Sequence, residues 1–144
     1  MWYGEYQHNL DEKNRFILPS KFRQQLKKIE NQKFYLTRGL DVCLFMFLEN
    51  DWRRLEDKFK ALPFTKHQAR SFNRLYFSGA YEVIPGSQGR VIIPDYLKDF
   101  AGIKKEVVII GVSDRIEIWD KRIWQDFYEK NRKNFEKMAE DIFE

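Results

Sequence analysis

The feature of this 144-residue chain that most limits its fold is an internal repeat. Asp11–Pro19 recurs 75 residues later as Gly86–Pro94, and both copies end in Arg, three apolar residues and Pro. A second block of matches follows at an offset of 72 residues: Gly39 with Gly111, Leu44 with Ile116, Phe47 with Trp119, and Trp52 with Trp124. Two blocks in the same order indicate a duplicated unit, so we expect two copies of one small module.

Each copy predicts two short strands around a polar tip. These strands are expected at residues 5–10 and 15–18 in the first copy, and 80–85 and 90–93 in the second. Asn14 and Gly89 occupy equivalent positions in the tips, and both residue types tolerate the positive φ of a tight turn. The sequence therefore predicts a hairpin-like turn in each copy, followed directly by Arg15 or Arg90.

A short helix and a second strand pair follow each tip. Pro19 and Pro94 are expected to open the helices, where the N–H that proline lacks has no partner to lose, and Gly102 ends the second helix. The strand pairs are predicted at 34–38 with 44–48, and at 107–112 with 116–119. Further helices are predicted at 51–62, at 65–78, and from about residue 120 to the end.

The last predicted helix carries apolar residues at heptad-like spacing. They are Trp124, Tyr128, Phe135, Met138 and Ile142, interrupted by Asn131. We expect this seam to pack on its own repeat, and contact with a second subunit is the alternative.

Composition narrows the class of protein. Hydrophobic residues make up 43% of the chain and aromatics 17%, which is enough to fill a core and excludes a largely disordered chain. The single cysteine, Cys43, lies in an apolar run and is expected to be a buried strand thiol rather than a nucleophile. With no signal peptide pattern and no apolar run near the ~20 residues of a membrane span, we expect a cytoplasmic protein.

Positive charge is concentrated in the first half of the sequence. Residues 1–79 carry 15 Lys or Arg against 9 Asp or Glu, whereas residues 80–144 carry 11 against 13. The total of +4 is compatible with nucleic-acid binding but does not require it. From this distribution we expect a polyanion to meet the first half.

Five segments closely resemble the MraZ family of transcriptional repressors. They are Glu5–Arg15, Leu36–Leu44, Phe77–Ala80, Gln88–Pro94 and Ile116–Trp119. The resemblance implies an α+β fold made of two tandem SpoVT/AbrB-like swapped-hairpin β-barrel repeats, related by a pseudo-twofold axis and carrying peripheral helices. On this basis we place the first repeat at residues 5–49, connecting helices at 50–79, the second repeat at 80–124 and a C-terminal helix at 125–144.

The resemblance also implies a function. It predicts a sequence-specific DNA-binding repressor of the division and cell-wall gene cluster, including its own operon. The protein would bind directly repeated elements of double-stranded promoter DNA as a homo-oligomeric ring, in the cytoplasm on the nucleoid. It implies no cofactor, no small-molecule ligand and no membrane.

The family's hallmark is an Asp-x-x-x-Arg loop in each repeat. The first loop is intact in Asp11 and Arg15, but Gly86 replaces the aspartate before Arg90, so the loops are not expected to contribute equally. An arginine on guanine is the commonest readout of a base edge, and the aspartate would hold Arg15 in one rotamer. Phosphate contacts would come from nearby cations, while Asn14 shapes the turn or touches a base. The predicted DNA-binding residues are Arg15, Asp11, Lys13, Asn14, Arg90, Lys21 and Arg23.

Each of these features also has a purely structural interpretation. An arginine at a turn is commonly only solvated, and Asp11 also fits an ordinary turn residue. His8 and His67 have no companions at metal-ligand spacing, and no catalytic motif occurs, so we expect neither a metal site nor an enzyme. Two other functions stay open: an antitoxin-like or protein-partner-binding module on the same fold, and RNA binding through the cationic tips.

Overall fold

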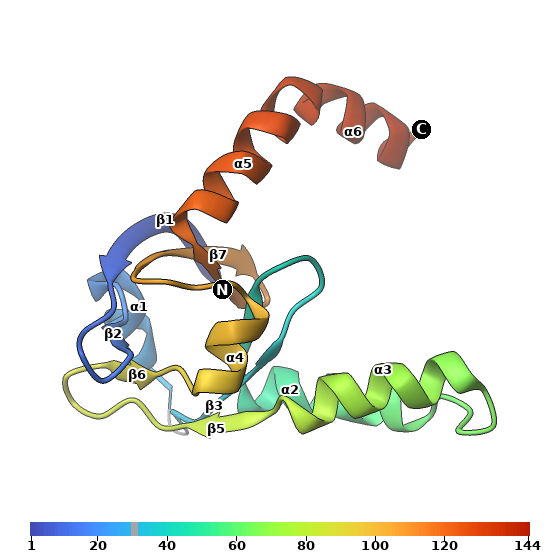
Figure 1. Cartoon of the computed structure of the whole chain (residues 1–144), viewed down its shortest axis with the longest axis horizontal. Helices are drawn as coiled ribbons and strands as arrows, with labels where there is room; N and C mark the ends of the chain where they lie inside the picture. The colour runs from blue at the N-terminus through green and yellow to red at the C-terminus, as the bar shows by residue number, and fades with distance from the viewer. Residues whose placement is uncertain (30–31) are drawn as a thin grey trace.

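The two copies of the repeat interleave in an antiparallel sheet. The computed structural model describes residues 1–29 and 32–144, and has an α+β architecture (Figure 1). In chain order its elements are β1 (Trp2–Asn9), β2 (Arg15–Ile17), α1 (Ser20–Leu26), β3 (Phe34–Arg38), β4 (Leu44–Leu48), α2 (Glu49–Lys60), α3 (His67–Ser78), β5 (Tyr81–Val83), β6 (Arg90–Ile92), α4 (Asp95–Phe100), β7 (Glu106–Ser113), β8 (Ile116–Asp120), α5 (Lys121–Asn131), the 3-10 helix η1 (Arg132–Asn134) and α6 (Phe135–Phe143).

The main sheet has six strands in the order β1-β7-β8-β4-β3-β5. The first strand of each copy leaves its own copy and pairs with the third strand of the other, β1 with β7 and β5 with β3. The β1 ladder is long, from Trp2 opposite Ser113 to Asn9 opposite Glu106, whereas β5 pairs over three residues only. Neither copy therefore holds a complete sheet of its own.

The register is symmetric about a pseudo-twofold axis. The remaining two strands, β2 and β6, pair with each other and place Phe16 opposite Val91, which are equivalent under the 75-residue offset. In the main sheet β4 pairs with β8 and places Phe45 opposite Glu117, which are equivalent under the 72-residue offset. An axis through these two pairs relates one copy to the other.

The turns expected at the two tips are confirmed, and the strands that flank each turn pair across the two copies. The tight turns are present, with φ of 58° at Asn14 and 69° at Gly89, but β1 and β2 separate and each pairs with a strand of the other copy. The reason is the core: Phe16 and Val91 form the inner face of the β2–β6 pair and are fully buried in one cluster that contains strands and helices of both copies. Pairing across the copies buries this apolar face, which a local three-residue hairpin would leave exposed.

A second, aromatic core attaches α2 and α3 to the sheet. Trp52 on α2 stacks between Tyr35 of β3 and Tyr76 of α3, with ring centroids 5.0 and 5.3 Å away. Cys43 belongs to the same cluster; it is fully buried, as predicted, and burial raises the pKa of its thiol far above the ordinary value. A thiol held in this protonated state is a poor nucleophile.

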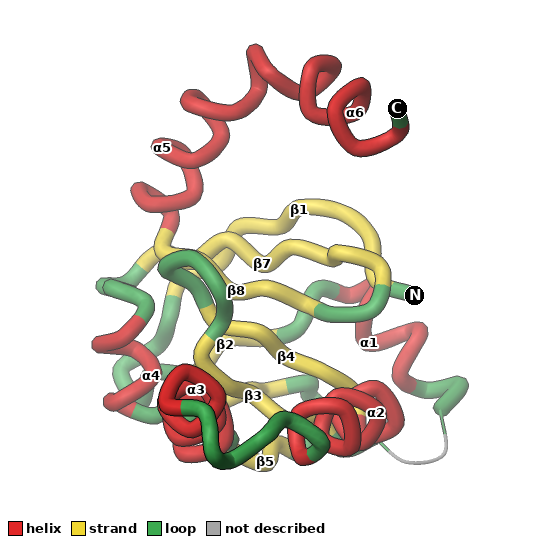
Figure 2. Tube along the Cα trace, turned by 90° about the vertical axis from the view of Figure 1, so that its right-hand side faces the viewer, coloured by secondary structure: helices red, strands yellow, loops and turns green. Residues whose placement is uncertain are grey.

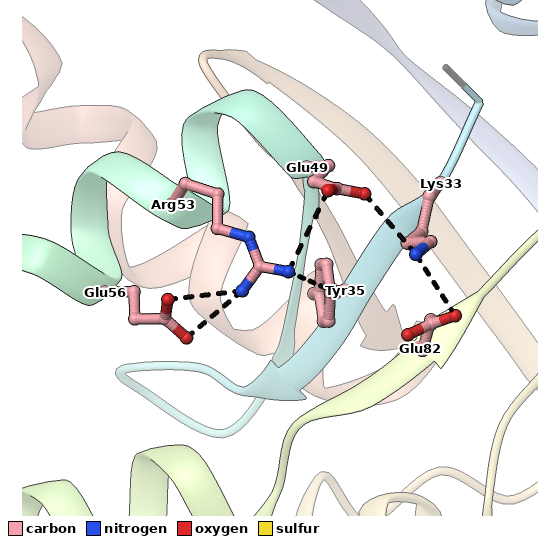
Figure 3. Close-up of polar contacts among 6 residues, drawn as sticks. All are labelled: Lys33, Tyr35, Glu49, Arg53, Glu56 and Glu82. Carbon is pink, nitrogen blue, oxygen red and sulfur yellow. Dashed lines mark hydrogen bonds and ion pairs between the residues drawn. The ribbon is translucent and has the colours of Figure 1, made fainter.

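Ion pairs fix α2 and β5 to the edge of the sheet (Figure 3). Lys33, next to β3, lies between Glu49 of α2 and Glu82 of β5, at 3.6 and 3.4 Å. The two carboxylates raise the pKa of Lys33, first Glu49 and then Glu82. Arg53 donates to Tyr35 Oη at 3.0 Å with its guanidinium over the ring, so α2 is oriented by polar as well as apolar contacts.

The chain ends in two helices rather than the single long helix that was predicted. Asp120 caps α5, its Oδ2 accepting from the backbone N–H groups of Arg122 and Ile123. Trp124 packs on Trp119 of the sheet, but the helix breaks after Asn131, whose side-chain amide donates to a backbone carbonyl of its own helix. Beyond η1, α6 turns to a new direction (Figures 1 and 2), so packing on the parent repeat stops with α5. In the described part of the chain no helix has the length and apolar character to span a membrane.

Candidate nucleic-acid interface

Asp11 organises the first tip. Its Oδ1 accepts hydrogen bonds from the backbone N–H groups of Lys13 and Arg15, both at 2.9 Å. Its Oδ2 accepts from Arg15 Nε at 2.8 Å. Together with the left-handed backbone at Asn14, these bonds fix both the turn and the direction of the arginine.

The electrostatics of the first tip favour the charged pair. The backbone N–H of Arg15 is the largest cause that lowers the pKa of Asp11, and the Arg15 side chain adds to it. Because the pKa is lowered in the folded state, the pair is intact at neutral pH and is lost only as acid takes the pH through that lowered value. The Arg15 side chain is 27% exposed, and within the described residues its terminal nitrogens make no hydrogen bond, so they are free to meet a ligand.

The outer face of the β2–β6 ribbon carries both tip arginines. Because side chains alternate along a strand, burial of Phe16 on the inner face puts Arg15 and Ile17 on the outer face, and the same holds for Arg90 and Ile92. The register places Arg15 opposite Ile92 and Ile17 opposite Arg90. This ribbon lies at the left edge of the molecule in Figure 1, far from α2 and α3. A two-stranded ribbon of this kind fits the width of the major groove of B-DNA.

The second tip lacks the carboxylate. Gly86 accepts a backbone hydrogen bond from Gly89 at 2.8 Å, so the turn is closed as in the first copy. Arg90, however, is exposed and has no ion pair among the residues the structure describes, and no contact from Ser87 replaces the missing aspartate. The two arginines thus share a face but differ in how firmly they are oriented.

Each short helix supports the tip of the other copy. Lys98 of α4 donates to Asn14 Oδ1 at 2.9 Å, and the Asn14 amide donates to Asp95 Oδ1 at 3.3 Å. Arg23 of α1, the equivalent of Lys98, lies over the second tip, where a Cβ on Gly89 would meet Arg23 Cδ at 2.5 Å. The Asn14 side chain is therefore engaged within the protein, whereas Arg23 packs its aliphatic stem against the second tip and its buried Nε has no hydrogen-bond partner among the described residues.

The other predicted cations are free at the surface. Lys13 is exposed on the first tip, and Lys21 is exposed in the first turn of α1. Neither makes an ion pair within the described ranges. Their placement allows contacts with a phosphate backbone on either side of the ribbon.

Three lysines of the second copy border the first tip, and the sequence did not point to them. Lys98, Lys104 and Lys105 line a shallow hollow together with Asp11 and Asn14. Interleaving brings these cations of the second half beside the first tip, so the positive charge around that tip comes from both halves of the chain. Applying the 75-residue offset to Arg23 would have identified Lys98 in advance.

A comparison with models of known protein families shows to which family the chain belongs. The family model described as "MraZ protein, putative antitoxin-like" matches twice, over residues 1–75 and 76–144. The chain belongs to the MraZ family. The two matches confirm the tandem repeat that the sequence indicated, and in this MraZ chain the equivalent segments Asp11–Arg15 and Gly86–Arg90 form the turns that lead into β2 and β6.

Gly86 gives a direct test of the asymmetry between the two MraZ loops. A Cβ added at Gly86 has no atom within 4 Å, so Gly86→Asp can be accommodated and would restore the pattern of the first loop. We expect it to tighten binding to operator DNA by up to about fivefold, the effect of an exposed pair worth ~0.2–1 kcal/mol. The measurement is a fluorescence-anisotropy titration, with Gly86→Ala as the matched control. If Gly86→Asp binds no better than Gly86→Ala, the carboxylate does not orient Arg90.

Proposed function

We propose that this MraZ protein is a sequence-specific transcriptional repressor that inserts the β2–β6 ribbon into the major groove of duplex DNA. One observation carries the proposal: two arginines project from the outer face of a two-stranded ribbon, and one of them is held by a carboxylate. A guanidinium presented in this way can bind guanine O6 and N7 with two hydrogen bonds.

The residues around the ribbon have distinct roles in this proposal. Arg15 reads a base edge, and Arg90 makes a less ordered contact of the same kind. Lys13 and Lys21 bind phosphates, joined by the lysines that border the first tip. Asp11, Asn14 and Arg23 do not touch DNA; they hold the tips in shape. The proposal needs no cofactor and assigns the protein no catalytic role.

The proposals on barrel closure, subunit assembly and target genes are drawn from the family to which the chain belongs. We propose that the β2–β6 pair and the main sheet close into SpoVT/AbrB-type barrels, since the first two strands of each copy pair only with strands of the other. We further propose that subunits assemble into a ring on directly repeated elements upstream of the division and cell-wall genes, including the protein's own operon. A single ribbon would bind DNA with low affinity. A ring holds several ribbons at fixed spacing, so their affinities for repeated DNA elements combine. We therefore propose that the protein acts on the nucleoid.

The salt dependence of binding tests the proposed docking. If the ribbon lies in the groove with its lysines on phosphates, log K should fall linearly with log salt, by ~0.9 for each phosphate contacted. Lys13→Ala is expected to weaken binding to all duplexes equally and to reduce that slope by about 0.9 for each tip bound. Titrations of wild type and Lys13→Ala between low and physiological salt give both values. A slope unchanged by the substitution would remove Lys13 from the interface.

A protein-binding module is the second candidate, and one observation favours it. The apolar residues of α6 are exposed, as in a helix that grips another protein. The two functions separate in one experiment: a footprint of the purified protein on the region upstream of its gene is expected for the repressor, and its absence at saturating protein favours the module.

A further inference from the structure

A loop of the second copy is held between the first tip and the start of α5. This loop follows α4 and contains Lys104 and Lys105. The backbone N–H of Leu10, just before the tip, donates to the Lys105 carbonyl at 2.8 Å, and the backbone N–H of Lys104 donates to Asp120 Oδ1 at 3.1 Å. Because the loop uses only backbone atoms in these bonds, both lysine side chains stay exposed while the loop is fixed beside the first tip.

The two lysines of this loop create an excess of positive charge on one side of the first tip. They line the shallow hollow beside that tip together with Lys98, and we call the three residues the lysine patch. Within the described residues the patch makes no ion pair, since Glu106, the next residue along the chain, is paired with Lys121 at 3.0 Å. Of the two acids in the hollow, Asp11 is paired within its own tip, which leaves Glu12 facing three lysines.

The equivalent positions beside the second tip do not form a matching patch. Under the 72-residue offset, Lys104 corresponds to Gln32 and Lys105 corresponds to Lys33. Lys33 lies between the carboxylates of α2 and β5, at 3.6 and 3.4 Å (Figure 3). Its charge is therefore neutralised within the protein, whereas that of Lys105 is open to a ligand.

The backbone bond that holds the loop beside the first tip also has no equivalent. Under the 75-residue offset Leu10 corresponds to Pro85, which has no N–H to donate. The Lys33 carbonyl accepts instead from the backbone N–H of Glu49 at 3.0 Å. The two ends of the ribbon thus differ in charge and in support, although the strands themselves are related by the pseudo-twofold axis.

We propose that the lysine patch binds the phosphate backbone of the DNA that flanks each element on the side of the first tip, and thereby sets the direction in which the protein lies on the element. A pseudo-twofold ribbon presents nearly the same outline to a groove in two opposite directions, and a phosphate contact on one side favours one of them. The inference rests on the proposed function, because it requires the ribbon to lie in the groove. Directly repeated elements, which all point the same way, suit a protein with such a preference.

Duplexes extended at one end only provide the test. Each carries a single element, as defined by the footprint, with about one helical turn (~10 base pairs) of flanking DNA on one side or on the other. Anisotropy titrations over a series of salt concentrations give the affinity and the salt slope for each duplex. We expect the wild type to bind one duplex at least about threefold more tightly, with a slope steeper by about 1.8 for two added phosphate contacts at ~0.9 each.

Substitution of the two loop lysines should remove this preference. In Lys104→Ala with Lys105→Ala, the exposed side chains are lost and the backbone bonds of the loop are kept, so the fold should persist. We expect this variant to bind both duplexes with equal affinity and equal slope. The matched control, Lys27→Ala with Lys28→Ala after α1, removes the same charge from the first copy and should keep the preference.

A cleaving label identifies which flank is preferred. Ser87→Cys places a thiol on the exposed second tip, and Cys43 is fully buried, so a thiol-coupled iron chelate attaches to the new thiol alone. On a duplex extended at both ends, the chelate cuts the DNA next to the second tip. The preferred flank should lie on the opposite side of the element, beside the first tip.

Four outcomes would each overturn the proposal: equal binding of both duplexes by the wild type, a preferred flank on the cleaved side, a preference kept by Lys104→Ala with Lys105→Ala, or a preference lost in the control as well. In all four cases tighter binding to the element than to scrambled DNA leaves the repressor function standing. If no duplex is bound, the repressor function fails and this inference fails with it.

Discussion

Arg15→Ala is expected to weaken binding to the promoter of the protein's own operon by roughly tenfold or more, because a bidentate arginine–guanine contact contributes ~1–3 kcal/mol of discrimination. Asp11 holds Nε of this arginine at 2.8 Å and the structure leaves its terminal nitrogens open, so the side chain is oriented before DNA arrives. Gel-shift titrations with operator and scrambled duplexes measure the loss. The loss should be larger on the operator, since base readout rather than charge is removed.

Three variants make the Arg15→Ala result interpretable. Arg122→Ala removes an exposed arginine on α5, away from the ribbon, and should bind normally. Arg15→Lys keeps the charge but not the planar fork, and should retain affinity for scrambled DNA while losing discrimination. Arg90→Ala should weaken binding less than Arg15→Ala, because Arg90 lacks a carboxylate partner in the described residues. Equal operator affinity of Arg15→Ala and wild type would remove Arg15 from the mechanism.

Phe16→Ala is expected to lower the free energy of unfolding by about 3–5 kcal/mol. Phe16 is fully buried at the centre of the ribbon, opposite Val91, so its removal leaves a cavity beneath both tips that neither short strand can close. The measurement is urea unfolding followed by circular dichroism, at a fixed protein concentration because subunit contacts contribute to apparent stability.

The neighbouring residue supplies the control for Phe16→Ala. Ile17 lies on the same strand but faces outward and is 39% exposed, so Ile17→Ala should lower the free energy of unfolding by no more than about 1 kcal/mol. Similar losses for the two variants would mean that the ribbon is not packed on the core, and the rigid presentation of both arginines would then be in doubt.

Local patterns predicted the elements but not all of their partners. The strands at 34–38 and 44–48 were predicted correctly, because the loop between them turns at Asp41 with a positive φ and returns the chain directly. The partner of β1 was not predictable in this way, since β7 lies about 100 residues further along the chain and any exposed edge of suitable pattern would have served. The break after Asn131 was visible as an interruption of the heptad spacing, but the new direction of α6 was not.

The same distinction applies to the candidate site, where contacts within one turn were predictable and contacts between the two copies were not. Asp11 and Arg15 are four residues apart in one turn, so their pairing follows from local sequence and the structure confirms it. The support of Asn14 by Lys98 spans 84 residues and depends on the interleaving of the two copies. The sequence pattern indicated the repeat and included Arg90 of the second copy in the site, but it did not indicate that Lys98, Lys104 and Lys105 would lie beside the first tip. The proposed domain limits and the DNA contacts themselves stay predictions.

Because β2 pairs directly with β6, the distance between Arg15 and Arg90 does not depend on the length of the segment that connects the two copies. Three residue pairs set the distance between Arg15 and Arg90, while the segment joining the copies runs through α2 and α3 at the other end of the molecule. Insertions or deletions in the loop at residues 61–66 can therefore accumulate among descendants of this chain without altering which base steps the two arginines span. In two separate chains, the spacing of the two arginines would be set only when the chains associate. Duplication and fusion have put both strands in one chain, so this spacing is fixed as soon as the chain folds.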